Sequence, residues 1–370
     1  MLRKAITLAA AGGIASLSVN ALAVTDAEFE ALQNQLNALA DRVESGPAET
    51  DTQIGGYGEL HYNNTGDGSG QRKKELDFHR FVLFVNHQFS NDIRLFTEIE
   101  IEHSVAGEGQ NGEVEIEQAY VQFDLDEETR LNAGLFLLPV GILNETHEPT
   151  TFYGVERNPV EKNIIPTTWW EGGAMLSGHN DSGVSYDIAL HSGINVDPTS
   201  INIRSGRTKV SEAPANNWAM TGRIKDTGLA GLELAASLQV QDDITLDSSD
   251  NVDGAALFET HAIWNTGPVT LRALYASWRI DGAGAEALGK DVQDGAYIEA
   301  AYKLNPSHGV FVRHNVWDNG GVAADTQQAQ TDIGYNYWPH EDVVIKIDYQ
   351  AQDKNAGDND GVNVGIGYQF

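Results

Sequence analysis

The sequence lacks cysteine altogether and is poor in proline and in basic residues. Its 370 residues include 10 prolines, and 23 lysines and arginines stand against 54 aspartates and glutamates. Without cysteine, a disulfide-stapled fold, a zinc-thiolate site and thiolate catalysis are excluded. The formal charge of −31 argues against a nucleic-acid partner, because affinity for DNA depends on clustered basic residues. After the first twenty residues there is no apolar run of about eighteen, so membrane-spanning helices are not expected.

Residues 1–23 have the features of a signal peptide. Arg3 and Lys4 precede an apolar run, and Ala21-Leu22-Ala23 offers the small residues of a cleavage site. We therefore expect export through a cleaved signal and a mature chain that starts near Val24. Removal of Arg3 and Lys4 changes the formal charge from −31 to −33.

Residues 24–50 carry a short heptad pattern. Apolar side chains recur at alternating spacings of three and four, the period of a helical seam, at Phe29, Leu32, Leu36, Leu39 and Val43. Gly46-Pro47 ends the pattern. We expect a periplasmic helix, and two roles stay open for it: a stalk that trimerises or contacts the cell wall, or an amphipathic helix that rests beneath the following domain.

From Thr52 onward the hydrophobic period changes to two, as in strands with one apolar and one polar face. An example is 230–242, where Leu, Ala and Val alternate with Glu, Ser and Gln. Sixteen such segments are expected, at 53–63, 76–89, 93–103, 113–125, 129–141, 170–180, 184–194, 215–225, 230–242, 255–264, 269–280, 296–304, 308–317, 327–338, 342–352 and 361–370.

The connections between these segments alternate strictly between short and long. Tight periplasmic turns and long extracellular loops produce this alternation in bacterial outer-membrane barrels. The sequence therefore predicts an all-β fold, a 16-stranded antiparallel transmembrane β-barrel over residues 51–370, located in the bacterial outer membrane. Aromatic residues near the short turns are expected to form an interfacial girdle, at Phe89, Trp264, Tyr302, Trp317, Tyr335, Tyr337 and Trp338.

The last residues form the most specific local pattern. Gly365, Tyr368 and Phe370 belong to an alternating strand that ends in Phe, which resembles the insertion signal of outer-membrane barrels. This signal predicts the barrel-assembly machinery as a partner during biogenesis, and lipopolysaccharide and outer-membrane lipid as the surroundings of the finished barrel.

The third long loop, 142–169, is the longest connection and contains three prolines. A sixteen-stranded barrel is too wide for its wall side chains to fill, so we expect this loop to fold inward and narrow the pore. A surface loop that contacts lipopolysaccharide or a neighbouring subunit is the alternative. The charged residues and histidine expected at the constriction are Glu145, His147, Glu148, Glu156, Arg157, Glu161 and Lys162.

Several segments resemble the phosphate-selective porin O/P family. They are Leu76–Phe81, Gln118–Val121, Gly134–Phe136 with Pro139–Gly141, and Tyr153–Pro159. The similarity covers about residues 52–370. It implies a homotrimeric, sixteen-stranded outer-membrane porin whose third loop forms the constriction, and whose best-known relatives select anions through arginines in the lumen.

Charges on the expected inner face bear on this selectivity. They include the arginines Arg80, Arg94, Arg223, Arg272 and Arg313 and the carboxylates Glu98, Glu100, Glu102, Glu113, Glu115, Glu233, Glu259, Glu299 and Asp348. Carboxylates outnumber guanidinium groups there and in the third loop, and a lumen rich in one charge concentrates ions of the opposite sign. The residue count therefore predicts weak cation preference or near-neutrality, whereas the resemblance implies phosphate or other anions; the question stays open at this level.

The function expected is passive diffusion of ions and small hydrophilic solutes. A structural or adhesive outer-membrane barrel that tethers the envelope is the alternative. No catalytic residue, cofactor or metal site is expected: the histidines are scattered, with no i, i+4 pair on a helix. Ser192 follows His191 directly, and neighbours on a strand point to opposite faces, so they do not form a nucleophile–base pair.

Overall fold

The protein is described from a computed structural model, which covers residues 51–66, 71–246, 251–322, 325–353 and 359–370. The expected signal peptide at 1–23 and the expected heptad helix at 24–50 lie outside the described residues. Within the described ranges, none of the helices has the length and apolar character needed to cross a bilayer.

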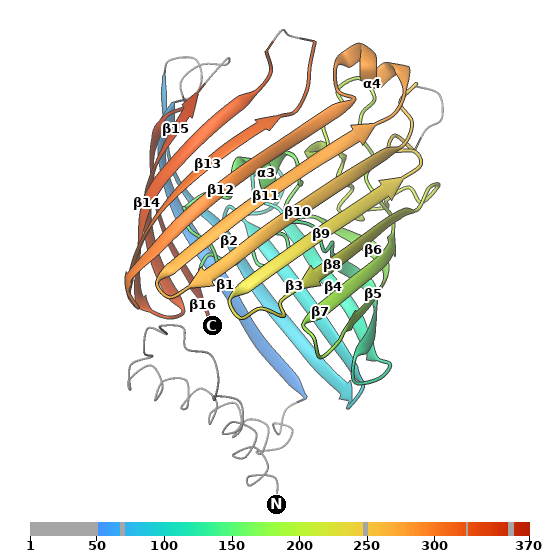
Figure 1. The fold of residues 1–370 in the computed structure, drawn as a ribbon, viewed down its shortest axis with the longest axis horizontal. Coiled ribbons are helices and arrows are strands. Elements are labelled where there is room, and N and C mark those ends of the chain that lie inside the picture. Colours follow the sequence, from blue (N-terminus) through green and yellow to red (C-terminus); the bar gives the residue numbers. More distant parts are fainter. Residues whose placement is uncertain (1–50, 67–70, 247–250, 323–324, 354–358) are drawn as a thin grey trace, which may run out of the picture. The chain divides into compact units, whose positions relative to one another are not determined.

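Residues from Thr52 onward form one closed antiparallel barrel in which every strand pairs with its neighbours in the sequence and β1 pairs with β16 (Figure 1). The predicted sixteen strands are confirmed. Their bounds are β1 Thr52–Gly66, β2 Arg72–Ser90, β3 Ile93–Glu102, β4 Val114–Asp124, β5 Thr129–Leu137, β6 Trp170–His179, β7 Val184–His191, β8 Ala219–Asp226, β9 Leu232–Gln241, β10 Ala255–Thr266, β11 Val269–Ile280, β12 Val292–Asn305, β13 His308–Asp318, β14 Gln328–His340, β15 Val343–Asp353 and β16 Gly361–Gln369.

The C-terminal strand closes the barrel against β1. Tyr368 is opposite Gly58, and Phe370 and Gly56 exchange both backbone hydrogen bonds, at 2.9 and 3.0 Å. The Phe370 ring is exposed and stacks on Phe81 with the centroids 6.3 Å apart. The terminal residues thus complete the hydrogen-bonded ring that an edge-free barrel requires.

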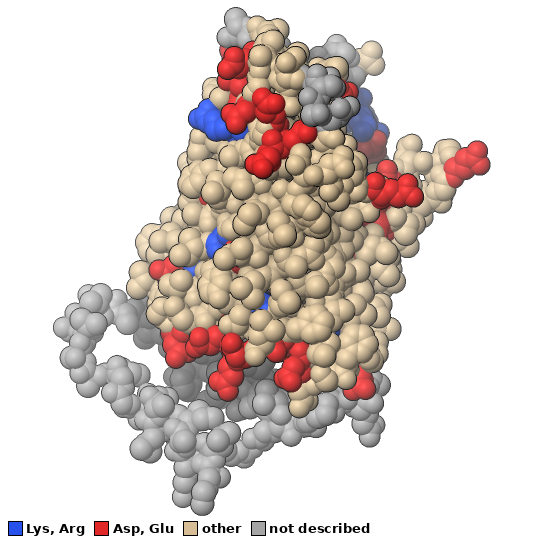
Figure 2. Space-filling model, turned by 90° about the vertical axis from the view of Figure 1, so that its right-hand side faces the viewer, with Lys and Arg blue, Asp and Glu red and all other residues tan. Residues whose placement is uncertain are grey.

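Alternate side chains of each strand face outward. In β16, for example, Val362, Val364 and Ile366 are exposed, whereas Asn363 is buried. Figure 2 shows the consequence on one face: acidic residues gather at the two ends of the barrel, and a broad band between them carries few charges. Such a band has the character expected of a surface in contact with hydrocarbon.

The aromatic girdle is only partly as predicted. Phe89, Trp264 and Tyr302 are exposed near the short turns. Trp317 instead is buried at the long-loop end of β13, and Trp338 packs edge-on against Tyr153 inside the barrel. The prediction failed at these two residues because position along a strand, without its register, does not say which face a side chain occupies.

Two long loops fill much of the barrel interior. The β5–β6 loop, residues 138–169, contains the short helix α3 Pro159–Asn163, which lies within the ring of strands (Figure 1). The β7–β8 loop, residues 192–218, contains the 3-10 turn η1 Arg204–Gly206. The helix α4 Ala283–Leu288 lies in the β11–β12 loop.

These two loops share a hydrophobic core with the inner wall. The core joins the loop residues Val160, Ile164, Trp169, Ile194 and Ile203 to the wall residues Leu257, Trp278 and Trp317. Their inward folding also explains why β5 ends at Leu137 rather than at 141 and why β8 begins at Ala219 rather than at 215. The residues between pair with loop atoms instead: the Leu138 N–H, for instance, donates to the Trp169 carbonyl at 3.0 Å.

Candidate functional site

The β5–β6 loop is tied to strands on several sides of the lumen. Lys346 of β15 donates to the Gly154 carbonyl at 2.8 Å, and the Val155 N–H donates to the Asp348 carboxylate at 2.6 Å. Arg272 of β11 donates to the Thr151 carbonyl at 3.0 Å. Since these strands belong to separate parts of the wall, the loop crosses the barrel interior.

Small residues of β16 make room for this crossing. A Cβ atom on Gly365 would lie 3.0 Å from a methyl group of Val155, and one on Gly367 would lie 2.4 Å from Pro149. Gly365, predicted as part of the assembly signal, therefore also provides a close approach between the wall and the β5–β6 loop.

Glu161 holds the loop together from within. Its carboxylate accepts the N–H groups of Ile142 and Leu143 at 2.9 and 2.6 Å, and the hydroxyl of Tyr297 in β12 at 2.8 Å. Asn158 caps α3 by accepting the Glu161 N–H at 2.9 Å. Burial raises the pKa of Glu161, whereas these hydrogen bonds lower it, and burial prevails. Fully buried, Glu161 does not line the aqueous lumen, where the sequence analysis had placed it.

His147 is inserted between two carboxylates of the wall. Its Nε2 lies 3.3 Å from Glu98 of β3 and 3.2 Å from Glu117 of β4, and Arg80 of β2 donates to its carbonyl at 2.7 Å. Burial alone would lower the pKa of His147, but Glu98 and Glu117 outweigh it and raise the pKa to about 10. The imidazolium is therefore the stable form at neutral pH, and it anchors the loop electrostatically.

Most other predicted constriction carboxylates have cationic partners as well. Glu145 pairs with Arg223 of β8, which also contacts Asp187 at 2.7 Å. Glu156 accepts from Asn63 at 2.9 Å and lies 3.1 Å from His61 Nδ1. Of the four loop carboxylates, only Glu148 has neither a hydrogen bond nor an ion pair to its side chain among the described residues.

The predicted lumen charges are similarly paired. Arg80 binds Glu59 at 2.6 Å and lies 3.8 Å from Glu100. The other pairs are Arg94 with Asp124, Arg272 with Glu299, and Arg313 with Glu299 and Asp332.

Four cations of the two inner loops, in contrast, form no ion pair with a carboxylate in the described part of the chain, although carboxylates lie near enough to influence them: Arg157, Lys162, Arg204 and Arg207. Arg204 and Arg207 donate to backbone carbonyls of the β5–β6 loop, and Arg157 Nε has no acceptor. Burial and the positive charges of Arg207 and Arg157 lower the pKa of Arg204, and the opposing influence of Glu102 and Glu115 does not offset them. We call these four residues the loop cation cluster.

Arg157 and Lys162 were expected at the constriction from the sequence, and Arg204 and Arg207 were not considered. The β7–β8 loop is long, and its isoleucine and valine residues are a signal for burial that could have revealed a second inward loop. The sequence does not predict which cations lie near one another, because the two loops come into contact through the tertiary fold.

Polar cavities lie at the two ends of the barrel. The cavity at the long-loop end has a volume of about 570 Å³ and is lined by Arg157, Lys162 and Glu156, among others. The cavity at the short-turn end has a volume of about 430 Å³ and is lined by Arg94, Asp124 and Arg223, among others. The β5–β6 loop contributes side chains to the first cavity, Glu156, Arg157 and Lys162 among them.

Comparison with known proteins agrees with this architecture. No family model matches the chain. An uncharacterized protein of Aquifex aeolicus is 29% identical over 360 residues, which cover 86% of this chain and 79% of that protein. Among solved structures, OmpF of Salmonella typhi in complex with daunomycin has a TM-score of 0.61 at 17% identity, with 87% of this chain and 98% of that chain covered.

Two further solved structures are similar over nearly the same share of this chain. The anion-selective porin of Comamonas acidovorans has a TM-score of 0.61 at 13% identity and covers 87% of this chain and all 100% of its own. The trimer form of OmpT from Vibrio cholerae has a TM-score of 0.57 at 10% identity and covers 86% and 98%. The fold is that of an outer-membrane porin.

His191 and Ser192 are the adjacent residues in the sequence that were considered as a nucleophile–base pair, and their contacts in the structure do not support such a pair. His191 contacts the Thr221 hydroxyl at 2.8 Å, whereas Ser192 donates to Glu171, so the two side chains do not meet. Both serve the packing of the β7–β8 loop against the wall.

Proposed function

We propose that this protein is an outer-membrane porin that admits small hydrophilic solutes by passive diffusion and prefers anions. The observation that carries the proposal is the loop cation cluster: four positive side chains of the inner loops that form no ion pair with a carboxylate among the described residues. The closed barrel with an apolar outer face and two polar end cavities supports the channel itself.

The proposed anion preference differs from the weak cation preference or near-neutrality that the count of charged residues in the sequence predicts. That count treated every carboxylate of the third loop as facing water. Glu161 instead is buried, Glu145 pairs with Arg223, and Glu156 is bound to His61 and Asn63. A paired carboxylate exerts a weaker field on a passing ion than a free cation does. One unpaired charge about 5 Å from an ion in water is worth roughly 0.8 kcal/mol, or about fourfold in relative permeability.

The assembly and the location are part of the proposal. The signal-like residues 1–23 would direct export, the C-terminal strand would be read by the barrel-assembly machinery, and lipid and lipopolysaccharide would surround the apolar band. OmpT of Vibrio cholerae has a trimer form, and we propose a homotrimer for this chain too. The resemblance to the phosphate-selective porin O/P family and the fold shared with an anion-selective porin support anions, phosphate included, as the solutes.

The test is the zero-current potential of the reconstituted protein in a tenfold KCl gradient. We expect the wild type to prefer chloride, and Arg157→Ala and Lys162→Ala each to reduce the anion-to-cation permeability ratio by up to about fourfold. Lys74→Ala is the matched control, since this exposed lysine lies near the tip of β2, outside the loop cation cluster.

Three results would contradict parts of the proposal. A cation-selective wild type would contradict the anion preference and support the prediction made from the excess of carboxylates in the sequence. An unchanged ratio in both variants would remove the loop cation cluster from the pore. A folded protein without conductance would favour the structural, envelope-tethering barrel. Addition of inorganic phosphate to the KCl solution then distinguishes a phosphate channel, in which chloride current falls, from a general anion pore, in which it does not.

A further inference from the structure

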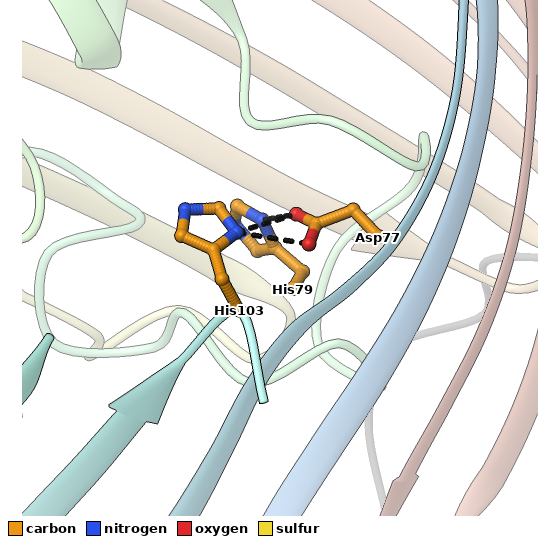
Figure 3. Close-up of side chains that lie close together, drawn as sticks. All are labelled: Asp77, His79 and His103. Carbon is orange, nitrogen blue, oxygen red and sulfur yellow. Dashed lines mark hydrogen bonds and ion pairs between the residues drawn. The ribbon is translucent and has the colours of Figure 1, made fainter. Parts of the chain in front are cut away.

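Three metal-ligating side chains converge at the long-loop end of the lumen. His103 Nδ1 lies 2.9 Å from both carboxylate oxygens of Asp77, and His79 Nδ1 lies 3.3 Å from Asp77 Oδ2. One donor atom from each residue falls within 4.8 Å of the other two. Figure 3 shows the two imidazole rings on the same side of the Asp77 carboxylate. We call Asp77, His79 and His103 the mouth triad.

The backbone brings the mouth triad together through two irregularities. Between the pairs Glu59↔Arg80 and His61↔Asp77, β1 advances by two residues and β2 by three. This bulge allows His79 and Arg80, consecutive residues, both to face inward. His103, directly after β3, has a φ of +52°, a left-handed conformation that is uncommon for a residue other than glycine.

His61 supports the triad without joining it. Its ring stacks on that of His79 with the centroids 4.7 Å apart and the planes 13° from parallel. Both His61 nitrogens are engaged, by Glu59 at 3.0 Å and by Glu156 at 3.1 Å. His61 therefore fixes the orientation of the His79 ring and is not itself available as a ligand, much as outer-shell groups orient ligands at known metal sites.

The geometry suits a tetrahedral divalent ion. With bonds of about 2.0–2.2 Å to nitrogen and oxygen, the edge of a tetrahedral zinc site is roughly 3.3 Å. The two contacts to Asp77 match that edge to within about 0.4 Å. The triad also lines the 570 Å³ cavity, so a fourth position is open to water or a solute. Two imidazoles and one carboxylate favour Zn²⁺ or Cu²⁺ over Ca²⁺ and Mg²⁺, which take oxygen ligands.

We propose that Asp77, His79 and His103 form a binding site for a late divalent transition metal, with Zn²⁺ as the test ion, at the entrance of the lumen. The site goes beyond passive diffusion: it would hold the ion, and it would add positive charge to the cavity that Arg157 and Lys162 also line. A second cluster inside the barrel, made of two carboxylates and one histidine (Glu98, Glu117 and His147), is buried and closed by its own ion pairs.

Titration calorimetry with ZnCl₂ tests the proposal on the full-length protein in detergent, without a polyhistidine tag. We expect one equivalent to bind, and the affinity to fall about tenfold or more in Asp77→Asn and in His103→Ala. His340→Ala is the matched control, because His340 belongs to an exposed triad with Glu341 and Asp342 at a short turn. Co²⁺ in place of Zn²⁺ should produce visible absorption bands of a tetrahedral site in the wild type and in His340→Ala, but not in Asp77→Asn or His103→Ala.

The outcomes separate this proposal from that of the porin. No binding by the wild type, or equal binding by the double variant of His79→Ala and His103→Ala, would overturn the metal site and leave the channel proposal untouched. Loss of binding in His340→Ala alone would show that Zn²⁺ binds at the short turn, and this result would also overturn the proposed site at the mouth triad. Heat-modifiable migration of each variant verifies that the barrel has formed. Calorimetry does not depend on conductance, so a protein without channel activity can still support the metal site.

Discussion

Removal of the His147 side chain should release the β5–β6 loop from the wall. His147→Ala leaves Glu98 and Glu117 without the imidazolium that lies 3.3 and 3.2 Å from them. Breaking a buried ion pair by removing one partner costs about 3–5 kcal/mol. The cost falls on the docking of the loop, because His147 takes no part in the hydrogen-bonded ladders of the strands. Since about 1.4 kcal/mol corresponds to a factor of ten, the undocked population should rise by roughly two to three and a half orders of magnitude.

Hydrogen exchange of the loop amides over residues 144–157 measures this population directly. Single-channel recording provides a second readout, in which larger or noisier open levels are expected as the loop leaves its position. His340→Ala is the control, a histidine on an exposed turn whose loss should change neither quantity. Exchange and conductance that match the wild type would refute the reasoning, because they would show that the carboxylates do not depend on His147.

Alkaline pH should produce the same release in the wild type. The pKa of His147 is raised to about 10, above its unfolded value of about 6.5. A group with a raised folded-state pKa contributes stability that is fully present below the unfolded pKa and is lost as the pH rises through the folded one. Loop exchange should therefore accelerate as the pH approaches about 10, beyond the intrinsic increase measured in His147→Ala. Identical pH profiles for the two proteins would contradict the assignment.

Three further predictions concern the loop and the closing strand. Shortening residues 144–168 should increase single-channel conductance, since the β5–β6 loop crosses the lumen; equal conductance would place it outside the ion path. Glu161→Ala should lower the free energy of loop docking, measured by the same hydrogen-exchange assay, by about 1–3 kcal/mol for each backbone N–H left unpaired. Glu161→Gln keeps an acceptor and should lower that free energy less. Deletion of Phe370 should lower the yield of heat-modifiable protein in the outer membrane, because it removes both hydrogen bonds to Gly56; an unchanged yield would count against the C-terminal signal.

The strand pattern alone determined the barrel. A period of two places alternate side chains on opposite faces, and the strict alternation of short and long connections distinguishes a membrane barrel from a soluble sandwich. Both features are local and recur along the whole barrel, so errors of a few residues at strand ends did not alter the count of sixteen strands. The pairing of the last strand with the first followed from the same pattern, since a barrel without edges must close, and the structure makes this closure through Phe370 and Gly56.

Only the tertiary structure decided how the lumen is lined. Glu161 and Lys162 are neighbours in the sequence, yet α3 turns Glu161 into the core and leaves Lys162 exposed. Arg204 donates to the Lys162 carbonyl because two loops far apart in the sequence pack against one hydrophobic core. The mouth triad depends on a one-residue bulge in β2 and on the left-handed conformation of His103. Side-chain direction in loops and at bulges is set by long-range packing rather than by local period, and for that reason the sequence predicted the barrel but not its interior.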